Sequence, residues 1–168
     1  KNNIKFNNAY FNRYKNIWHH GDYAEVKNNN GFVIYGRSDT TLNPGGVRLG
    51  TAEIYSEVER FIEIKEAIVV GQSWDNDVRI VLFIIMNKNY NISDSLLKKI
   101  KQQIRKNASP RHVPGKIIVV RDIPRTKSGK IVELAVKNTI ENNEIKNREA
   151  LVNPEALEEY KNLRELEY

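Results

Sequence analysis

The sequence predicts an α+β fold in which a short sheet is flanked by helices. Residues 78–86 are nearly all β-branched or aromatic, as in a strand that is buried on both faces. Two segments, which follow Thr51 and Ser93, carry apolar side chains at helical spacing. The chain has 168 residues, 40% of them apolar, which is enough for a sizeable core without disulfides or metal.

Residues 1–38 are expected to be the end of a large N-terminal domain, because the chain starts at Lys1 with residues typical of the middle of a fold. Two β-rich runs, residues 23–27 and 32–35, flank an Asn-Gly turn, which is a strong hairpin signal. We assign the hairpin to residues 22–36. The rest of that domain is expected to precede this chain.

Residues 39–145 are expected to form the α+β domain. The pattern predicts, in order, a helix capped by Thr51 that runs to about residue 63, with Ile62 on its apolar face, strands at 67–71 and 78–86, a helix capped by Ser93 that ends before Pro110, a strand at 116–121 and a helix from residue 131. The apolar strand 78–86 belongs in the middle of the sheet.

Residues 146–168 are expected to form a helical tail. Asn153-Pro154 is typical of a helix start, since proline is favoured at the first helical position. Leu157, Tyr160 and Leu163 then form its apolar face.

The composition narrows the chemistry. The chain has no cysteine, which excludes thiol catalysis, disulfides and cysteine-based zinc sites. Its net charge of +6 and its isoelectric point near 9.4 favour phosphorylated or polyanionic ligands. The longest apolar stretch, residues 80–86, is too short to span a membrane, and no signal peptide is visible.

The strongest candidate for anion binding is Pro-Arg-Thr-Lys-Ser-Gly-Lys at residues 124–130. Pro124 stiffens the approach, and Gly129 allows a backbone conformation that other residues avoid. We expect Lys130 to project its charge from the start of a helix, where free N–H groups favour anions. Arg125 and Lys127 would add supporting charge. The alternative is a solvated basic turn.

Three further groups could bind a nucleotide. Asp22 could accept hydrogen bonds from the two adjacent hydroxyls of a ribose. Alternatively, it only stabilises a turn. Arg37 could clamp a phosphate and Asp39 could be a backbone pivot, or the two form a surface salt bridge. Gly46 and Arg48 place open backbone beside a cation. The adjacent histidines, His19 and His20, point in different directions and are not interpreted as a metal site.

Four motifs follow one another in this chain: Trp-x-x-Gly-Asp at residues 18–22, Tyr-Gly-Arg-x-Asp at 35–39, Gly-x-Arg-Leu-Gly-x-x-Glu-Ile at 46–54, and the basic loop at 124–130. As a set they resemble the adenylate-forming acyl-CoA synthetases, and the resemblance covers about residues 18–140. Residues 10–22, 42–55 and 147–163 resemble in particular the members of this family that ligate acetoacetate to CoA.

The resemblance implies a role for each matching residue. Lys130 would be the catalytic lysine of adenylation and Asp39 the hinge of a mobile C-terminal domain. The remaining roles are nucleotide binding by Asp22, Arg37 and Arg48, and CoA binding by Gly46 and Arg105.

The implied reaction joins acetoacetate to CoA at the expense of ATP, which is cleaved to AMP and diphosphate, with Mg²⁺ accompanying the ATP. The implied setting is the cytoplasm, with small-molecule substrates and the preceding domain of the same protein as partners, and with no membrane or nucleic acid. The chain alone is expected to be inactive, because it lacks the acyl pocket. Two alternatives stay open: a ligase for another short-chain acid, and a basic binding module without catalysis.

Overall fold

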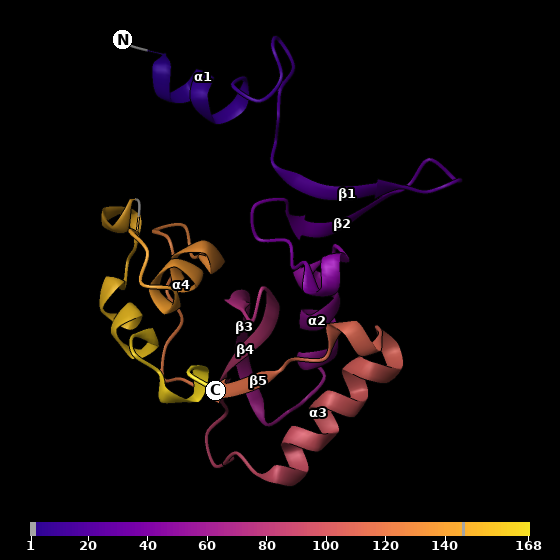
Figure 1. The fold of residues 1–168 in the computed structure, drawn as a ribbon, viewed down its shortest axis with the longest axis vertical. Coiled ribbons are helices and arrows are strands. Elements are labelled where there is room, and N and C mark those ends of the chain that lie inside the picture. Colours follow the sequence, from indigo (N-terminus) through magenta and orange to yellow (C-terminus); the bar gives the residue numbers. More distant parts are fainter. Residues whose placement is uncertain (1–2, 146) are drawn as a thin grey trace.

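The computed structural model describes residues 3–145 and 147–168. A three-stranded sheet lies at its centre, and a two-stranded hairpin and a short helix lie on the side of the N-terminus (Figure 1). The helices and strands are α1 (Ile4–Tyr10), β1 (Asp22–Val26), β2 (Phe32–Arg37), α2 (Thr51–Val58), β3 (Ile64–Trp74), β4 (Asp77–Met86), α3 (Asp94–Asn107), β5 (Lys116–Val119) and α4 (Glu133–Ile140).

The central sheet has the order β3-β4-β5, so the apolar strand lies in the middle as expected. β3 and β4 are antiparallel and joined by a tight turn at Asp75 and Asn76, both with positive φ, the geometry of the hairpin turns that match strand twist. β4 and β5 are parallel, and α3 makes the crossover between them. β3 is longer than the expected strand 67–71, and β5 is shorter than 116–121.

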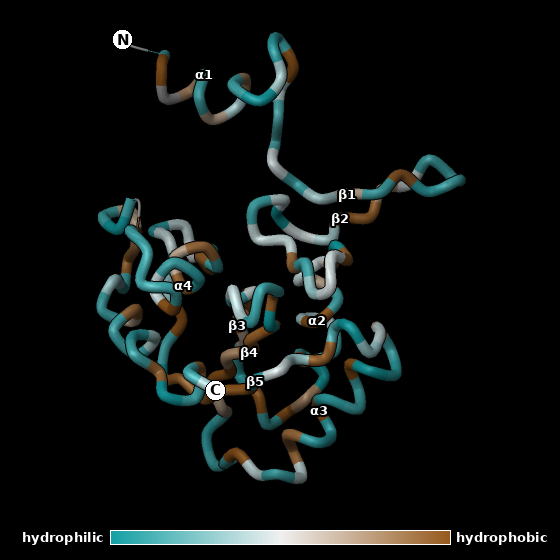
Figure 2. Tube along the Cα trace, in the orientation of Figure 1, coloured by the Kyte–Doolittle hydropathy of each residue, from teal (hydrophilic) through white to brown (hydrophobic). Residues whose placement is uncertain are grey.

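Alternate residues of the central strands enter two separate cores. Val81, Phe83 and Ile85 pack with α4 and the C-terminal tail, whereas Ile80, Leu82 and Ile84 pack with α2 and α3. A period of two along a strand produces this division. Figure 2 shows much of the central sheet in the hydrophobic colour and the outer loops mostly in the hydrophilic one.

Helix α2 corrects the expected helix to residue 63. Thr51 is its first residue rather than its cap, which is Gly50. A Cβ on residue 50 would lie 2.4 Å from the carbonyl oxygen of Tyr35, so the close approach of β2 requires glycine there. The helix ends at Val58, and Ile62 is 71% exposed. The side chain of Asn87 donates to the carbonyls of Ile62 and Ile64, at 2.7 and 3.3 Å, which guides the chain into β3.

Helix α3 begins where the sequence predicts. The Ser93 hydroxyl accepts the N–H of Leu96 at 3.2 Å, which satisfies a free donor at the helix start. Leu96, Ile100 and Ile104 are buried against α2 and the sheet.

The expected tail helix is instead a 3₁₀ helix at Pro154–Tyr160. Leu157 and Tyr160 are fully buried, and Leu163 packs beside them. The ring of Tyr160 meets that of Phe83 edge-on, with centroids 4.8 Å apart. The tail covers the face of the sheet opposite α2 and α3 (Figure 1).

The N-terminal part contains the expected hairpin, as β1 pairs with β2 in antiparallel register. Before it, Trp18 stacks on Tyr10 with centroids 4.0 Å apart. Within the described ranges, no helix combines the length and apolarity needed to cross a bilayer.

Candidate functional site

Lys130 lies on a tight loop between β5 and α4. The loop is closed by an antiparallel bridge between Arg125 and Ile131. Inside it, the N–H of Thr126 donates to the carbonyl of Lys130 at 2.9 Å, and the Thr126 hydroxyl accepts the N–H of Lys130 at 3.1 Å. Gly129 has φ +81°, a conformation that glycine adopts without strain. The turn therefore fixes the backbone of Lys130 while its side chain stays exposed.

The expectation that Lys130 starts a helix is wrong. α4 begins at Glu133, and the bridge to Arg125 holds Ile131 in an extended segment. The charge is thus presented by a hairpin-like loop and not by the N–H groups of a helix start.

Arg125 does not add a free charge to this loop. Its guanidinium pairs with the carboxylate of Glu66 on β3 and donates to the carbonyl of Gly129 at 3.1 Å. Arg125 and Glu66 are both about 30% exposed, so their charges largely neutralise each other in a half-buried contact. Lys130 and Lys127 are the exposed cations of the sequence 124–130.

Arg37 and Asp39 form a salt bridge at the end of β2. Nε and Nη2 of Arg37 donate to the two carboxylate oxygens of Asp39, at 3.3 and 3.2 Å. This contact raises the pKa of Arg37 above its usual value. The surface salt bridge that the sequence offered as the alternative for these two residues is therefore present in this conformation.

Asp22 lies beside this pair at the start of β1. Its Oδ2 is 2.5 Å from Nδ1 of His20, and the carbonyl of His20 accepts from Arg37 at 3.4 Å. Gly21, with φ +89°, leaves room for Arg37, because a Cβ there would lie 3.1 Å from the guanidinium. The pairing of β1 with β2 thus brings Asp22 beside Arg37 and its partner Asp39.

A small cavity of about 120 Å³ is lined by Asp39 on one side and by residues of α4 on the other. Its lining includes Thr41, Val70, Glu133 and Lys137. The cavity lies under the polar segment that leads out of β2.

The glycine loop before α2 is held by Asp77. The carboxylate of Asp77 accepts the N–H of Gly45 at 2.8 and 3.0 Å. The amide groups of Val78 and Gly45 lower the pKa of this carboxyl group. Gly46 has φ +76°, and a Cβ there would meet nothing within 4 Å, so the backbone faces open space.

Of the other two arginines with a predicted binding role, Arg48 lies in the loop before α2 and Arg105 lies on α3. The guanidinium of Arg48 stands 5.6 Å from the ring centroid of Tyr23 on β1, within the range of a cation–π contact. Arg105 is exposed in the last turn of α3.

Residues 53–130 match the family model described as the AMP-binding enzyme C-terminal domain. This chain contains an AMP-binding enzyme C-terminal domain. The match ends at Lys130, the last residue of the basic loop.

Three relatives extend the similarity beyond residues 53–130. Acetoacetyl-coenzyme A synthetase of Rhizobium meliloti (strain 1021) is 56% identical, over 96% of this chain and 25% of that protein. Acetoacetyl-CoA synthetase of Xenopus tropicalis is 45% identical, over 99% of this chain and 25% of that protein. The structure of acetoacetyl-CoA synthetase from Streptomyces lividans superposes with a TM-score of 0.85 at 37% identity, over 94% of this chain and 24% of that one.

The chain spans about a quarter of the length of these relatives. The expected resemblance to the adenylate-forming synthetases and the expected α+β fold are confirmed. The domain boundaries at residues 38 and 145 and the roles of the individual site residues stay predictions.

Sequence reasoning missed two groups of hydrogen bonds, around Tyr55 and around His112, that brace the C-terminal domain near its loops. The hydroxyl of Tyr55 on α2 donates to Glu133 on α4 at 2.5 Å and accepts the N–H of Val69 at 3.0 Å. Nε2 of the buried His112 is 3.0 Å from Glu53, and its Nδ1 is 2.8 Å from the hydroxyl of Ser109. Tyr55 and Glu133 are 78 residues apart, and Glu53 and His112 are 59 residues apart, so no local pattern indicated these two links.

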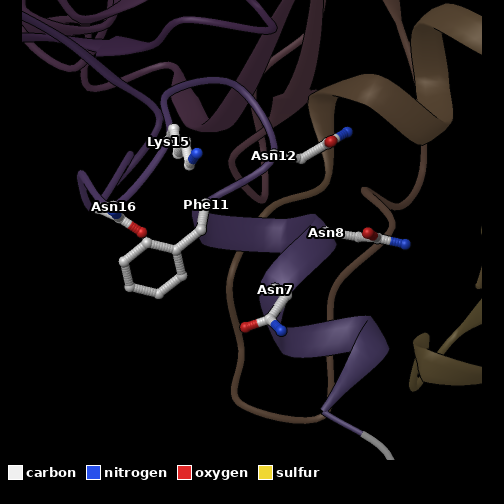
Figure 3. Close-up of a pocket in the computed structure, with 6 residues that line it drawn as sticks. All are labelled: Asn7, Asn8, Phe11, Asn12, Lys15 and Asn16. Atoms are coloured by element: carbon white, nitrogen blue, oxygen red, sulfur yellow. The ribbon is translucent and has the colours of Figure 1, made fainter.

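A separate, open depression of about 590 Å³ lies on the N-terminal segment, lined by Asn7, Asn8, Phe11, Asn12, Lys15 and Asn16. In Figure 3, Asn8 and Asn12 point to one side, and Asn7 and Phe11 to the other. These side chains do not converge on a common point, and five of the six are amides or a phenyl ring, which are neither acids nor nucleophiles in catalysis.

Proposed function

We propose that this chain is the C-terminal portion of an acetoacetate–CoA ligase. The complete protein would activate acetoacetate as an acyl-adenylate with release of diphosphate, and then transfer the acyl group to CoA with release of AMP. The observation that carries the proposal is Lys130, which is exposed on a braced loop at the end of the segment that matches the AMP-binding family.

Lys130 would act in the first half-reaction. The attack of a carboxylate on the α-phosphate of ATP brings two anions together, and an ammonium group beside the reacting oxygens lowers that barrier. Mg²⁺ would arrive with ATP as part of the nucleotide substrate. Asp22 and Arg37 would hold the ribose and phosphates, and Arg48 would add a further phosphate contact.

Asp39 would be the hinge between two orientations of the domain. A single static arrangement cannot present both Lys130 and the path of the CoA thiol to one reacting carbon, so rotation would exchange the two faces. In the second orientation, the open backbone at Gly46 would let the pantetheine arm pass, and Arg105 would contact a CoA phosphate.

The proposed partner of this domain is the N-terminal part of the same protein, which would contain the acyl pocket. We also propose a cytoplasmic location, where ATP and CoA are both available. The relatives named acetoacetyl-CoA synthetase support acetoacetate as the acid.

The test is an assay of the full-length protein with ATP, CoA and a panel of short acids. We expect AMP and acyl-CoA to form fastest with acetoacetate, and no turnover by residues 1–168 alone. A preference for acetate or butyrate would leave the ligase chemistry intact but refute the substrate. No turnover with any acid, together with salt-sensitive binding of RNA, would favour the basic binding module instead.

A further inference from the structure

Asn153 ties the C-terminal tail to the strand-like segment that leads into the Lys130 loop. Its Oδ1 accepts the N–H of Arg125 at 2.8 Å. Its Nδ2 donates to the carboxylate of Asp122 at 2.6 Å and to the carbonyl of Ile123 at 3.0 Å. One amide side chain thus holds residues 122, 123 and 125 of the approach, on both sides of Pro124.

The tail backbone continues this contact along the loop itself. Thr126 and Leu151 form an antiparallel bridge. The N–H of Val152 donates to the carbonyl of Arg125 at 2.9 Å, and that of Lys127 to the carbonyl of Ala150 at 3.3 Å. The tail therefore acts as a short strand laid beside the loop.

The opposite side of the loop is fixed to the central sheet. Glu66 on β3 pairs with the guanidinium of Arg125, which also donates to the carbonyl of Gly129. Arg125 thereby connects β3 to the residue immediately before Lys130.

The tail is itself immobilised by burial. Leu151, Leu157 and Tyr160 are at most 6% exposed, and the hydroxyl of Tyr160 donates to the carbonyl of Asp122 at 2.8 Å. The support for the loop therefore rests on the hydrophobic core and not on a loose chain end.

We propose that Asn153 and Glu66 are positioning residues that hold the Lys130 loop in its productive shape from two sides. This inference rests on the proposed function, because it assigns them to the adenylation step that Lys130 serves. A reacting ammonium must be held to within a fraction of an ångström, and a misplacement of about 1 Å can cost roughly a hundredfold in rate. Neither residue needs to touch a substrate.

The test compares Asn153→Ala with Asn87→Ala in the full-length protein. Asn87 is the control, since its amide also donates two hydrogen bonds, to the backbone carbonyls of Ile62 and Ile64, and neither of these bonds reaches residues 122–130. We expect Asn153→Ala to lower kcat of adenylation by about ten- to a hundredfold with little change in KM for ATP. Thioester formation from supplied acyl-adenylate should be unchanged, because that step uses the other domain orientation. Asn87→Ala should alter neither half-reaction selectively.

Glu66→Gln provides a second variant in case Asn153→Ala does not fold. It removes the charge that pairs with Arg125 and keeps an oxygen acceptor, so it should show the same selective loss at smaller size. Hydrogen exchange gives a readout without activity: the amides of Lys127 and Val152 should exchange faster in Asn153→Ala, while those of β4 keep their protection.

Equal behaviour of Asn153→Ala and Asn87→Ala in both half-reactions, or loss of both half-reactions together, would overturn the positioning role. Lys130→Ala separates this outcome from failure of the proposed function. If Lys130→Ala loses adenylation while the Asn153 and Glu66 variants keep it, only the positioning role is wrong. If Lys130→Ala keeps adenylation, the proposed function is wrong as well.

Discussion

The guanidinium of Arg37 holds both carboxylate oxygens of Asp39, at 3.3 and 3.2 Å, across the single residue Ser38. The hydroxyl of Thr41 donates to the carbonyl of Ser38 at 2.7 Å, so the backbone at this point is fixed in one conformation. A rotation about the φ angle of Asp39 would carry its carboxylate away from Arg37 and break this contact. The pair would then act as a latch for the domain orientation seen here.

Asp39→Ala tests the latch. The two side chains are about half exposed, so the free energy of unfolding should change by less than about 1 kcal/mol. The overall turnover of the full-length protein should nevertheless fall, with changes in both kcat and KM, as is typical of hinge substitutions. Chemical denaturation and steady-state kinetics on the same samples check both parts. Unchanged turnover would remove Asp39 from the hinge.

Asp77→Ala tests the glycine loop proposed for the pantetheine arm. Loss of the carboxylate frees the N–H of Gly45, so the loop should become less ordered and KM for CoA should rise, while adenylation should be retained. The control is Asp75→Asn, two residues away on the same hairpin, because asparagine removes the charge and tolerates the positive φ of that position. A rise in the KM for ATP without one for CoA would contradict this role of the loop.

The pH dependence of the same loop has a definite sign. Hydrogen bonds from Val78 and Gly45 lower the pKa of Asp77 below its ordinary value of 3.8. A group whose folded pKa is lowered stabilises the fold above its unfolded pKa, and this contribution is lost as the pH falls through the folded value. The NMR signal of the Gly45 amide should therefore shift with a midpoint below pH 3.8. A midpoint at or above that value would show that the contact is weak in solution.

Tyr55→Phe tests the link between α2 and α4. The substitution leaves the N–H of Val69 without its acceptor and Glu133 without its donor. An unsatisfied buried group costs about 1–3 kcal/mol, so the free energy of unfolding should fall by about that amount. Tyr90→Phe, at a 41% exposed tyrosine, should change it by less than about 0.5 kcal/mol.

Alkaline pH should weaken the same link. Burial, followed by the charge of Glu133, raises the pKa of Tyr55 well above 10.0. A tyrosine with a raised folded pKa stabilises the fold below its unfolded pKa, and the contribution is lost as the pH rises above it. The stability difference between the wild type and Tyr55→Phe should therefore shrink above about pH 10. A difference that persists at high pH would contradict the contact.

Local patterns predicted much of the fold. The apolar run at 78–86 indicated a central strand, Ser93 indicated the start of α3, and the Asn-Gly turn indicated the hairpin, because each depends on residues close in sequence. The same reasoning extended α2 too far. Ile62 fits the helical spacing, but the side chain of Asn87 binds the carbonyls of Ile62 and Ile64 and directs this segment into β3.

The sequence indicated which residues belong to the candidate site, but not the contacts that hold them in place. The motif at 124–130 identified Lys130, yet it did not indicate that Glu66 neutralises Arg125 or that Asn153 holds the loop. These partners lie 59 and 28 residues from Arg125. The sequence suggested that Asn153 caps a helix, whereas its side chain accepts the N–H of Arg125 in the loop and makes no capping hydrogen bond.

The measurement that tests the account most directly compares the two half-reactions of Lys130→Ala in the full-length protein. The rate of adenylation, measured as ATP–diphosphate exchange in the presence of acetoacetate, should fall by a factor of about 10²–10³. This is the usual cost of losing one group that stabilises transition-state charge. Transfer from supplied acetoacetyl-adenylate to CoA should continue at close to the wild-type rate. Equal loss of both half-reactions, or adenylation at the wild-type rate, would contradict the account.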